Sequence, residues 1–195
     1  GGNHTLDQLG IGFETATSKY VQYFADGRPV SSGYGKALHF EIKWANDVQA
    51  YNTVKQNGGG RACLTEYHDM IFDGVQFNEK VRLVPLEDID MRLWYGLQFV
   101  SWGTTYTNLR FIDGGNRGVF TSGNVNSGNL KTSGIEAYGN DHKIVVSVDT
   151  SIDLGKREEI STDSAGAFTS SSKGYFRIVS QNGQNVWNAG DSYYH

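Results

Sequence analysis

The sequence predicts an all-β protein, an antiparallel β-sandwich or jelly roll with little helix. The first observation behind this prediction is the abundance of Gly, 25 of 195 residues, beside many Asn and Ser, which are turn residues. The second is that aromatic residues, which favour strands and can fill a core, make up 13% of the chain. The third is that short segments alternate between apolar and polar residues, the period of a strand with one buried face. Many strands with few helix signals indicate two antiparallel sheets packed face to face.

Length and terminal residues predict the domain organisation. A chain of 195 residues is expected to form one domain, residues 1–195, because β-sandwiches of this size are often undivided. The Gly1-Gly2 start and the aromatic end at Tyr193-Tyr194 favour a domain excised from a larger protein. We therefore expect the rest of a multidomain protein as a partner, and residues 193–194 as a final strand.

Charge, apolar stretches, cysteine content and missing motifs argue against several classes of protein. The net charge is −4 and there is no run of Lys and Arg, so nucleic acid is not an expected partner. No stretch of about 18 apolar residues occurs, so membrane insertion is not expected. Cys63 is the only cysteine and cannot form an internal disulfide bond, which argues against a disulfide-built secreted domain. Motifs of serine hydrolases, zinc proteases and P-loop enzymes are absent from the sequence.

The segment from Leu38 to Trp44 has the clearest strand pattern. Its apolar and polar residues alternate without a break, so one face of the strand is apolar and the other carries imidazole, carboxylate and ammonium groups. The three residues of the polar side are His39, Glu41 and Lys43. Eight further segments rich in β-formers are expected to be strands. They are residues 19–24, 61–72, 75–84, 92–102, 109–112, 143–149, 174–180 and 185–187.

Turn residues predict two hairpins. Asp73-Gly74 and Asn182-Gly183 each separate two β-forming segments, which is a strong hairpin signal. Asp26-Gly27 predicts a further turn.

Three other segments are expected to lie outside the strands. Residues 85–90 either start a short helix at Pro85 or form an acidic loop, and both alternatives fit the residues. Residues 121–134 and 161–173 consist mostly of Ser, Gly, Asn and Thr, and we expect long surface loops there.

A polar sheet face is the main candidate site. The even-numbered residues of segment 92–102 and residues 175 and 177 are expected on the same face as the polar side of Leu38–Trp44. Aromatic rings stack on the C–H faces of sugars, while amides and charged groups hydrogen-bond to hydroxyls. Ordinary solvent-facing residues are the alternative interpretation. The candidate ligand-binding residues are His39, Glu41, Lys43, Arg92, Trp94, Gln98, Trp102, Tyr175 and Arg177.

Two further clusters have chemistry of their own. Glu66 and His68 are expected to share a strand face. They are either an acid–base pair or half of a metal site, or they are ordinary residues at the end of a strand. Acidic loops offer the oxygen ligands that calcium takes. No cofactor is expected other than, as an alternative, one structural calcium ion. Its candidate ligands are Asp88, Asp90, Asp113 and Asn116.

The composition and expected architecture resemble carbohydrate-binding β-sandwich modules. They imply a carbohydrate-binding module or lectin-like domain that binds a polysaccharide or glycan on a sheet face or at loop tips. One alternative is a jelly-roll polysaccharide lyase or glycoside hydrolase, in which a Tyr or His base, cations or paired carboxylates act on the sugar. The other is a phage tail-fibre or adhesin receptor-binding domain. We expect an extracellular, cell-surface or virion location, and no catalytic residue is assigned.

Overall fold

The computed structural model is built of β-strands in antiparallel sheets, so the all-β prediction is confirmed. Each of the nine segments predicted as strands contains a strand. Within the described part of the chain, no helix is long and apolar enough to span a membrane. The structure describes residues 16–32, 34–49, 61–91, 94–100, 106, 108–112, 115–119, 125–126, 133–139, 141–152, 154, 166–170, 173–179 and 185–195.

The chain divides into two compact units. Unit 1 comprises Gly1–Ile89 and Trp187–Tyr194, and unit 2 comprises Asp90–Val186 and His195. The prediction of a single domain stays a prediction, because two compact units can still fold together.

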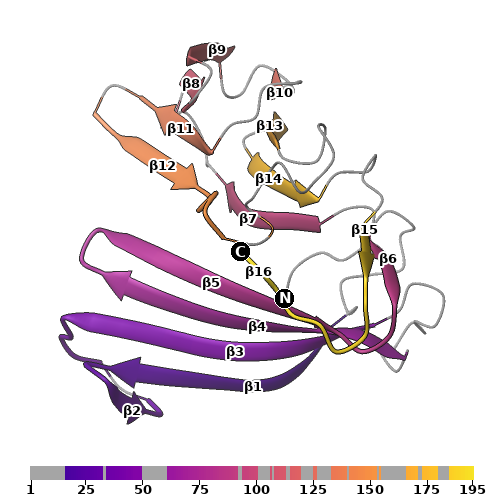
Figure 1. Cartoon of the computed structure of the whole chain (residues 1–195). Helices are drawn as coiled ribbons and strands as arrows, with labels where there is room; N and C mark the ends of the chain where they lie inside the picture. Colours follow the sequence, from indigo (N-terminus) through magenta and orange to yellow (C-terminus); the bar gives the residue numbers. More distant parts are fainter. Residues whose placement is uncertain are drawn as a thin grey trace. The chain divides into compact units, whose positions relative to one another are not determined.

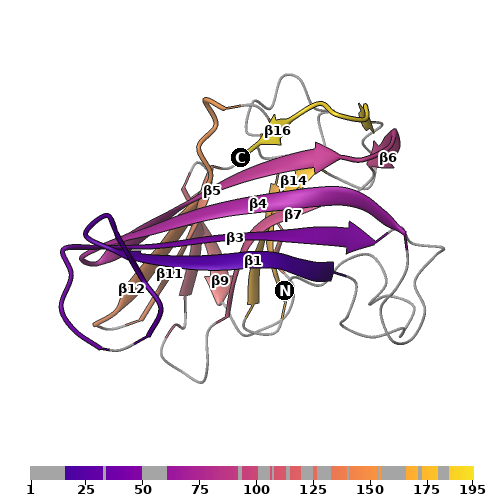
Figure 2. The same cartoon turned by 90° about the horizontal axis from the view of Figure 1, so that it is seen from below.

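Unit 1 is built on a six-stranded sheet in the order β16-β5-β4-β3-β1-β2. Short strands form its two edges, β2 (Arg28–Val30) and β16 (Tyr193–Tyr194), and the second confirms the predicted final strand. Four long strands lie side by side between them in Figures 1 and 2: β1 (Ala16–Ala25), β3 (His39–Gln49), β4 (Ala62–Asp73) and β5 (Gln76–Pro85).

The six-stranded sheet has one mainly apolar face, which also carries Asn46, Glu66, His68 and Glu79, and one mainly polar face, which also carries Ile71 and Val84. Directly opposite residues of a ladder share a face, and Phe40 lies opposite Phe72 while Lys43 lies opposite Asp69. The predicted alternation is therefore confirmed from His39, where β3 begins. The apolar face carries Val21, Tyr23, Phe40, Ile42, Trp44, Val48, Leu64, Met70, Phe72, Phe77, Val81 and Leu83. The polar face carries Tyr20, Gln22, Phe24, His39, Glu41, Lys43, Ala45, Asp47, Thr65, Tyr67, Asp69, Asp73, Asn78, Lys80 and Arg82.

Part of the apolar face forms the core of unit 1. Leu64 and Leu83 are 1% and 0% exposed. Tyr193 lies opposite Leu83 in the ladder and stacks on the buried Trp187, with ring centroids 4.6 Å apart. The final strand therefore extends the core from the C-terminal end of the chain.

A row of four aromatic rings crosses the same apolar face nearer the hairpin turns. Tyr23, Phe40, Phe72 and Phe77 follow one another across four strands, with neighbouring ring centroids 6.4, 6.0 and 5.5 Å apart. The two outer rings are partly exposed, whereas the inner two are half-buried.

Tight turns with positive φ join the strands of unit 1. Asp26 and Gly27 have φ values of 47° and 76°, so both central residues are left-handed, as in a type I′ turn. Between β4 and β5, Asp73 pairs with Gln76, and Gly74 is the first central residue, with φ 62°. A type II′ turn requires this position of Gly. The predicted hairpin is confirmed, and its turn starts one residue later than the sequence indicated.

Unit 2 contains two four-stranded sheets. The first has the order β10-β13-β14-β7, with β10 (Val125–Asn126), β13 (Gly166–Ser170), β14 (Lys173–Val179) and β7 (Trp94–Val100). The second has the order β12-β11-β8-β9, with β12 (Lys143–Ser147), β11 (Gly134–Tyr138), β8 (Asn108–Phe111) and β9 (Gly115–Val119). A separate two-stranded sheet pairs β6 (Ile89–Met91) with β15 (Asn185–Trp187).

Several local expectations need correction. Residues 86–88 form a loop between β5 and β6, so the helix alternative for this acidic segment is wrong. The two segments expected to be loops contain β10 and β13, because ladder hydrogen bonds can hold Ser and Gly in strands despite their low propensity. The second hairpin is also wrong, since β15 pairs with β6 rather than with β14. Residues 182–183 of that expected turn lie outside the described residues.

Candidate functional site

The structure places the predicted ligand-binding residues in two different sheets. His39, Glu41 and Lys43 lie on the polar face in unit 1. Trp94, Gln98, Tyr175 and Arg177 lie on β7 and β14 in unit 2, while Arg92 and Trp102 lie outside the described residues. The nine residues therefore do not belong to one sheet face, because β3 and β7 are not part of the same sheet.

The ladder between β7 and β14 is irregular. Gln98 lies directly opposite Tyr175, as expected for residues of one face. Arg177 instead lies opposite Tyr95, which the alternation of segment 92–102 assigns to the other face. Register shifts separate these pairs, and one extra residue in a strand reverses the faces beyond it. The alternation that grouped Gln98, Tyr175 and Arg177 on one face is therefore interrupted between Tyr175 and Arg177.

On the polar face of unit 1, Glu41, Lys43 and Asp69 form a charged cluster. Lys43 Nζ lies 3.1 Å from Glu41 Oε1 and 3.7 Å from Asp69 Oδ2. The hydrogen bond to Glu41 raises the pKa of Lys43 against an opposing effect of burial, and the charge of Asp69 adds to the rise. The ammonium group also lies 5.5 Å from the centroid of the Phe24 ring. Lys43 is therefore held in one position by two carboxylates and a ring.

Asp69 is unusual within this cluster. Its Oδ1 atom is buried and accepts no hydrogen bond in the described part of the chain. Burial, followed by a hydrogen bond with Glu41, raises the pKa of Asp69, although Lys43 and Lys80 oppose this. Glu41 and Asp69 therefore both contact the ammonium group of Lys43.

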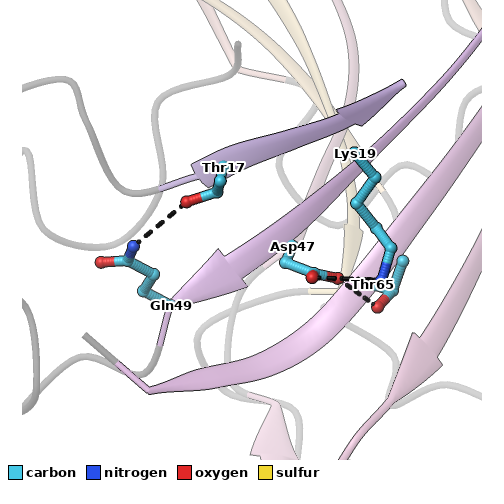
Figure 3. Close-up of polar contacts among 5 residues, drawn as sticks. All are labelled: Thr17, Lys19, Asp47, Gln49 and Thr65. Carbon is cyan, nitrogen blue, oxygen red and sulfur yellow. Dashed lines mark hydrogen bonds and ion pairs between the residues drawn. The ribbon is translucent and has the colours of Figure 1, made fainter. Parts of the chain in front are cut away.

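A second polar network is centred on Asp47 (Figure 3). Lys19 Nζ donates to both carboxylate oxygens of Asp47 at 3.2 and 3.1 Å, and Thr65 Oγ1 donates to Oδ1 at 2.6 Å. Gln49 Nε2 donates to Thr17 Oγ1 at 3.4 Å. Lys19 lies at a bulge of β1, in the part of this strand that β2 does not cover, because β2 pairs only with residues 23–25. A bulge and a Lys at an open strand edge discourage pairing with other chains. This network is best explained as a structural feature of the sheet.

One cross-strand row of the polar face combines a ring with a guanidinium group. The row consists of Tyr20, Ala45, Tyr67 and Arg82, which lie opposite one another on β1, β3, β4 and β5; we call it the Tyr20–Arg82 row. Arg82 Cζ lies 4.2 Å from the centroid of the Tyr67 ring, within the range of a cation–π interaction. Tyr20 is 41% exposed, whereas Ala45 is fully buried. The row therefore offers an open ring on β1 and an ordered cation on β5, and Tyr194 of β16 lies opposite Arg82 beyond it.

The apolar face contains a polar cluster of its own around His68. His68 Nδ1 lies 2.8 Å from Glu79 Oε1, and Nε2 lies 3.7 Å from Glu66 Oε2, an ion-pair distance too long for a hydrogen bond. Asn46 Nδ2 donates to Glu66 Oε1 at 2.9 Å. The imidazole stacks on Trp44, with ring centroids 4.4 Å apart and 4° between the planes. Burial lowers the pKa of His68, but the carboxylates of Glu66 and Glu79 outweigh it and raise the value to about 9.

The His68 cluster is thus an imidazolium ion between two carboxylates at neutral pH. This confirms that Glu66 and His68 share a face and interact. Among the described residues, no group of three or more His, Cys, Asp and Glu side chains is arranged to hold a metal ion.

The calcium candidates are spread over both units. Asp88 Oδ1 accepts a hydrogen bond from the Ala189 amide at 2.9 Å, which ties this loop to the C-terminal segment. Asp90 begins unit 2, Asn116 lies on β9, and Asp113 is outside the described residues. Calcium binding at these positions stays a prediction.

Tyr20, Tyr67 and Arg82 were not among the residues predicted from the sequence. The signal that identifies Tyr67 and Arg82 as neighbours is the hairpin at Gly74, because a two-residue turn fixes the register of both strands. Tyr20 becomes a member of the row only through the long-range ladder of β1 with β3.

In comparisons with known proteins, no family model matches the chain, and no curated protein or solved structure is significantly similar to it.

Proposed function

We propose that the protein is a carbohydrate-binding domain that binds a polysaccharide or glycan across the polar face of the six-stranded sheet. The observation that carries the proposal is the Tyr20–Arg82 row, where an exposed ring and a fixed guanidinium group share one sheet face with charged and amide side chains. An aromatic ring supports the apolar side of a sugar, and convergent polar groups bind its hydroxyls.

The charged cluster beside the row supports binding because its groups are already ordered. Lys43 and Glu41 hold each other at 3.1 Å, so a ligand does not have to immobilise either side chain. Side chains ordered in advance reduce the entropic cost of association. Gln22 and Asn78 add exposed amides on the same face.

The geometry of Glu41 and Asp69 favours binding over hydrolysis at this face. Glycoside hydrolases place two carboxyl groups at least about 5 Å apart, so that a sugar or a water fits between them. Lys43 Nζ lies 3.1 Å from Glu41 and 3.7 Å from Asp69, so its ammonium group occupies the space between the two carboxylates. We therefore propose a non-catalytic role for this pair.

The proposed function also implies a sheet arrangement, a location and a partner for the protein. We propose a sandwich-type arrangement of the sheets, an extracellular, cell-surface or virion location, and a polysaccharide or glycan as the partner. A structural calcium ion remains part of the proposal, with the candidate residues given above. A receptor-binding tip of a phage fibre or adhesin would use the same face to bind sugar.

Substitution of Tyr20 tests the proposal. We expect Tyr20→Ala to weaken retention by a polysaccharide that retards the wild-type protein in affinity gel electrophoresis. The expected loss is about tenfold or more, because stacking residues at the centre of a binding surface contribute about 1–2 kcal/mol or more. Both neutral and acidic polysaccharides are tested.

Tyr23→Ala is the matched control. Tyr23 lies on the same strand, is also 41% exposed and belongs to the apolar face. The Tyr23→Ala substitution should leave retention by the polysaccharide unchanged. Equal losses in the two variants, or no retention of the wild-type protein by any polysaccharide, would contradict the proposed function.

A further inference from the structure

Arg82 provides an ordered positive charge that binding of a neutral sugar would not require. Arg82 is exposed on β5, and its guanidinium group rests on the Tyr67 ring at 4.2 Å. A ring beneath the guanidinium fixes its plane and leaves its donors directed outward. An ordered guanidinium is the group that proteins use to bind planar anions with two parallel hydrogen bonds.

Two other cations of the polar face, Lys19 and Lys43, are neutralised by carboxylates. Lys19 pairs with Asp47, and Lys43 pairs with Glu41 and Asp69. Arg82 forms no ion pair with any carboxylate of the described residues; its guanidinium group contacts the Tyr67 ring, and its strand neighbour on the other side is Tyr194. Within the described part of the chain, this cation is therefore ordered without being neutralised.

Lys80 adds a second positive charge beside it. The two residues are separated by one position on β5, so both side chains lie on the polar face about 7 Å apart. Lys80 lies opposite Asp69, which already forms an ion pair with Lys43 at 3.7 Å. Arg82 and Lys80 thus form a local excess of positive charge in a protein whose net charge is −4.

The direction of the row shows how a polymer would reach this charge. Tyr20 and Arg82 are three strand spacings apart, roughly 14 Å between their backbones, and the small residue Ala45 lies between them. A short run of sugars that crosses the strands would place one ring against Tyr20 and a substituent of a later ring against Arg82.

We propose that the ligand is an acidic glycan, whose anionic substituent is bound by Arg82 with the help of Lys80 while a neighbouring sugar stacks on Tyr20. The inference rests on the proposed function. The substituent is a carboxylate, as in a uronic acid, or a sulfate ester, since both offer two oxygens to the guanidinium fork.

Retention by three polymers tests this inference: polygalacturonate carries carboxylates, dextran sulfate carries sulfates and dextran is neutral. The wild-type protein should be retained by polygalacturonate or dextran sulfate more strongly than by dextran, and the stronger of the two identifies the anion. Arg82→Gln should weaken that retention at least about tenfold, because hydrogen bonds to charged groups are stronger than hydrogen bonds between neutral groups.

Arg28→Gln is the matched control for charge. Arg28 is an exposed arginine of β2 opposite Ala25, on the apolar side of the same sheet. It should change retention less than twofold. Far-ultraviolet circular dichroism verifies that both variants keep the strand content of the wild-type protein.

The outcomes separate this inference from the proposed function. Retention by dextran or another neutral polysaccharide that depends on Tyr20 but not on Arg82 would overturn the acidic-glycan inference and leave the proposed function intact. Equal losses in Arg82→Gln and Arg28→Gln would indicate attraction by net charge alone and would also overturn it. Absence of retention by every polysaccharide would overturn both.

Discussion

Replacing His68 with Ala should lower the free energy of unfolding by about 3–5 kcal/mol, because it removes the cation from a buried ion pair. His68 lies between Glu66 and Glu79, and Glu66 is only 4% exposed. Without the imidazolium, the Glu66 carboxylate would remain buried with Asn46 as a hydrogen-bond donor but would lose the positive charge of His68. Trp44 would also lose its stacking partner. Urea-induced unfolding at pH 7 measures the difference.

His39→Ala is the control for this prediction. His39 lies on the same sheet and faces Asp73 at 3.8 Å, but its side chain is 61% exposed. Exposed pairs of this kind contribute about 0–1 kcal/mol, so the control should remain close to the wild-type protein. Similar losses in the two variants would show that the buried position of His68 has no special importance.

The same cluster predicts how stability depends on pH. The pKa of His68 is raised from 6.5 to about 9 in the folded protein, so the folded state binds the proton more tightly than the unfolded state. The resulting stabilisation is fully present below pH 6.5 and is lost as the pH rises through 9. It amounts to at most about 3 kcal/mol, at about 1.4 kcal/mol per pKa unit. The difference in unfolding free energy between wild-type protein and His68→Ala should therefore shrink between pH 7 and pH 10. A constant difference would contradict the charged state assigned to His68.

Leu83→Ala should destabilise unit 1 by about 2–5 kcal/mol. Leu83 is fully buried on the apolar face, opposite Glu66 on one side and Tyr193 on the other. Truncation would leave a cavity beside a buried carboxylate and under the strand that carries Tyr193. The same urea experiment measures the loss.

Val75→Ala provides the exposed comparison. Val75 lies in the turn that precedes Leu83 on the same hairpin and is fully exposed, so its truncation should cost less than about 0.5 kcal/mol. A loss below about 1 kcal/mol for Leu83→Ala would contradict the position of the core on this face.

Local patterns were sufficient to predict the four long strands of unit 1 and the two faces of β3. The alternation from His39 to Trp44 is a property of adjacent residues, and it specified which side chains of β3 would be polar. Positive φ at Gly74 likewise reflects a residue-specific preference, although the choice between type I′ and type II′ moved the turn by one residue. Such features depend on a few neighbouring residues and can be read without the rest of the fold.

Strand partners could not be predicted in this way. The strand at Asn185–Trp187 pairs with β6 rather than with β14, a choice made between segments nearly a hundred residues apart. The candidate site has the same limitation. Glu41 and Lys43 were found from β3 alone, whereas Arg82 becomes relevant only when the ladder places it over Tyr67. The grouping of Trp94 and Tyr175 with the β3 residues was wrong because parity says nothing about which sheet a strand joins.

The central claim is that the polar face of the six-stranded sheet binds the glycan, and the most direct measurement is an NMR titration of the unmodified protein. The ring resonances of Tyr20 and Tyr23 are followed while an oligosaccharide of the retained polysaccharide is added. The two side chains belong to the same strand and are equally exposed to solvent, but they lie on opposite faces of the sheet. We predict that the resonances of Tyr20 and Tyr67 shift in proportion to bound ligand while those of Tyr23 stay in place. Shifts at Tyr23 with none at Tyr20 and Tyr67 would contradict the account.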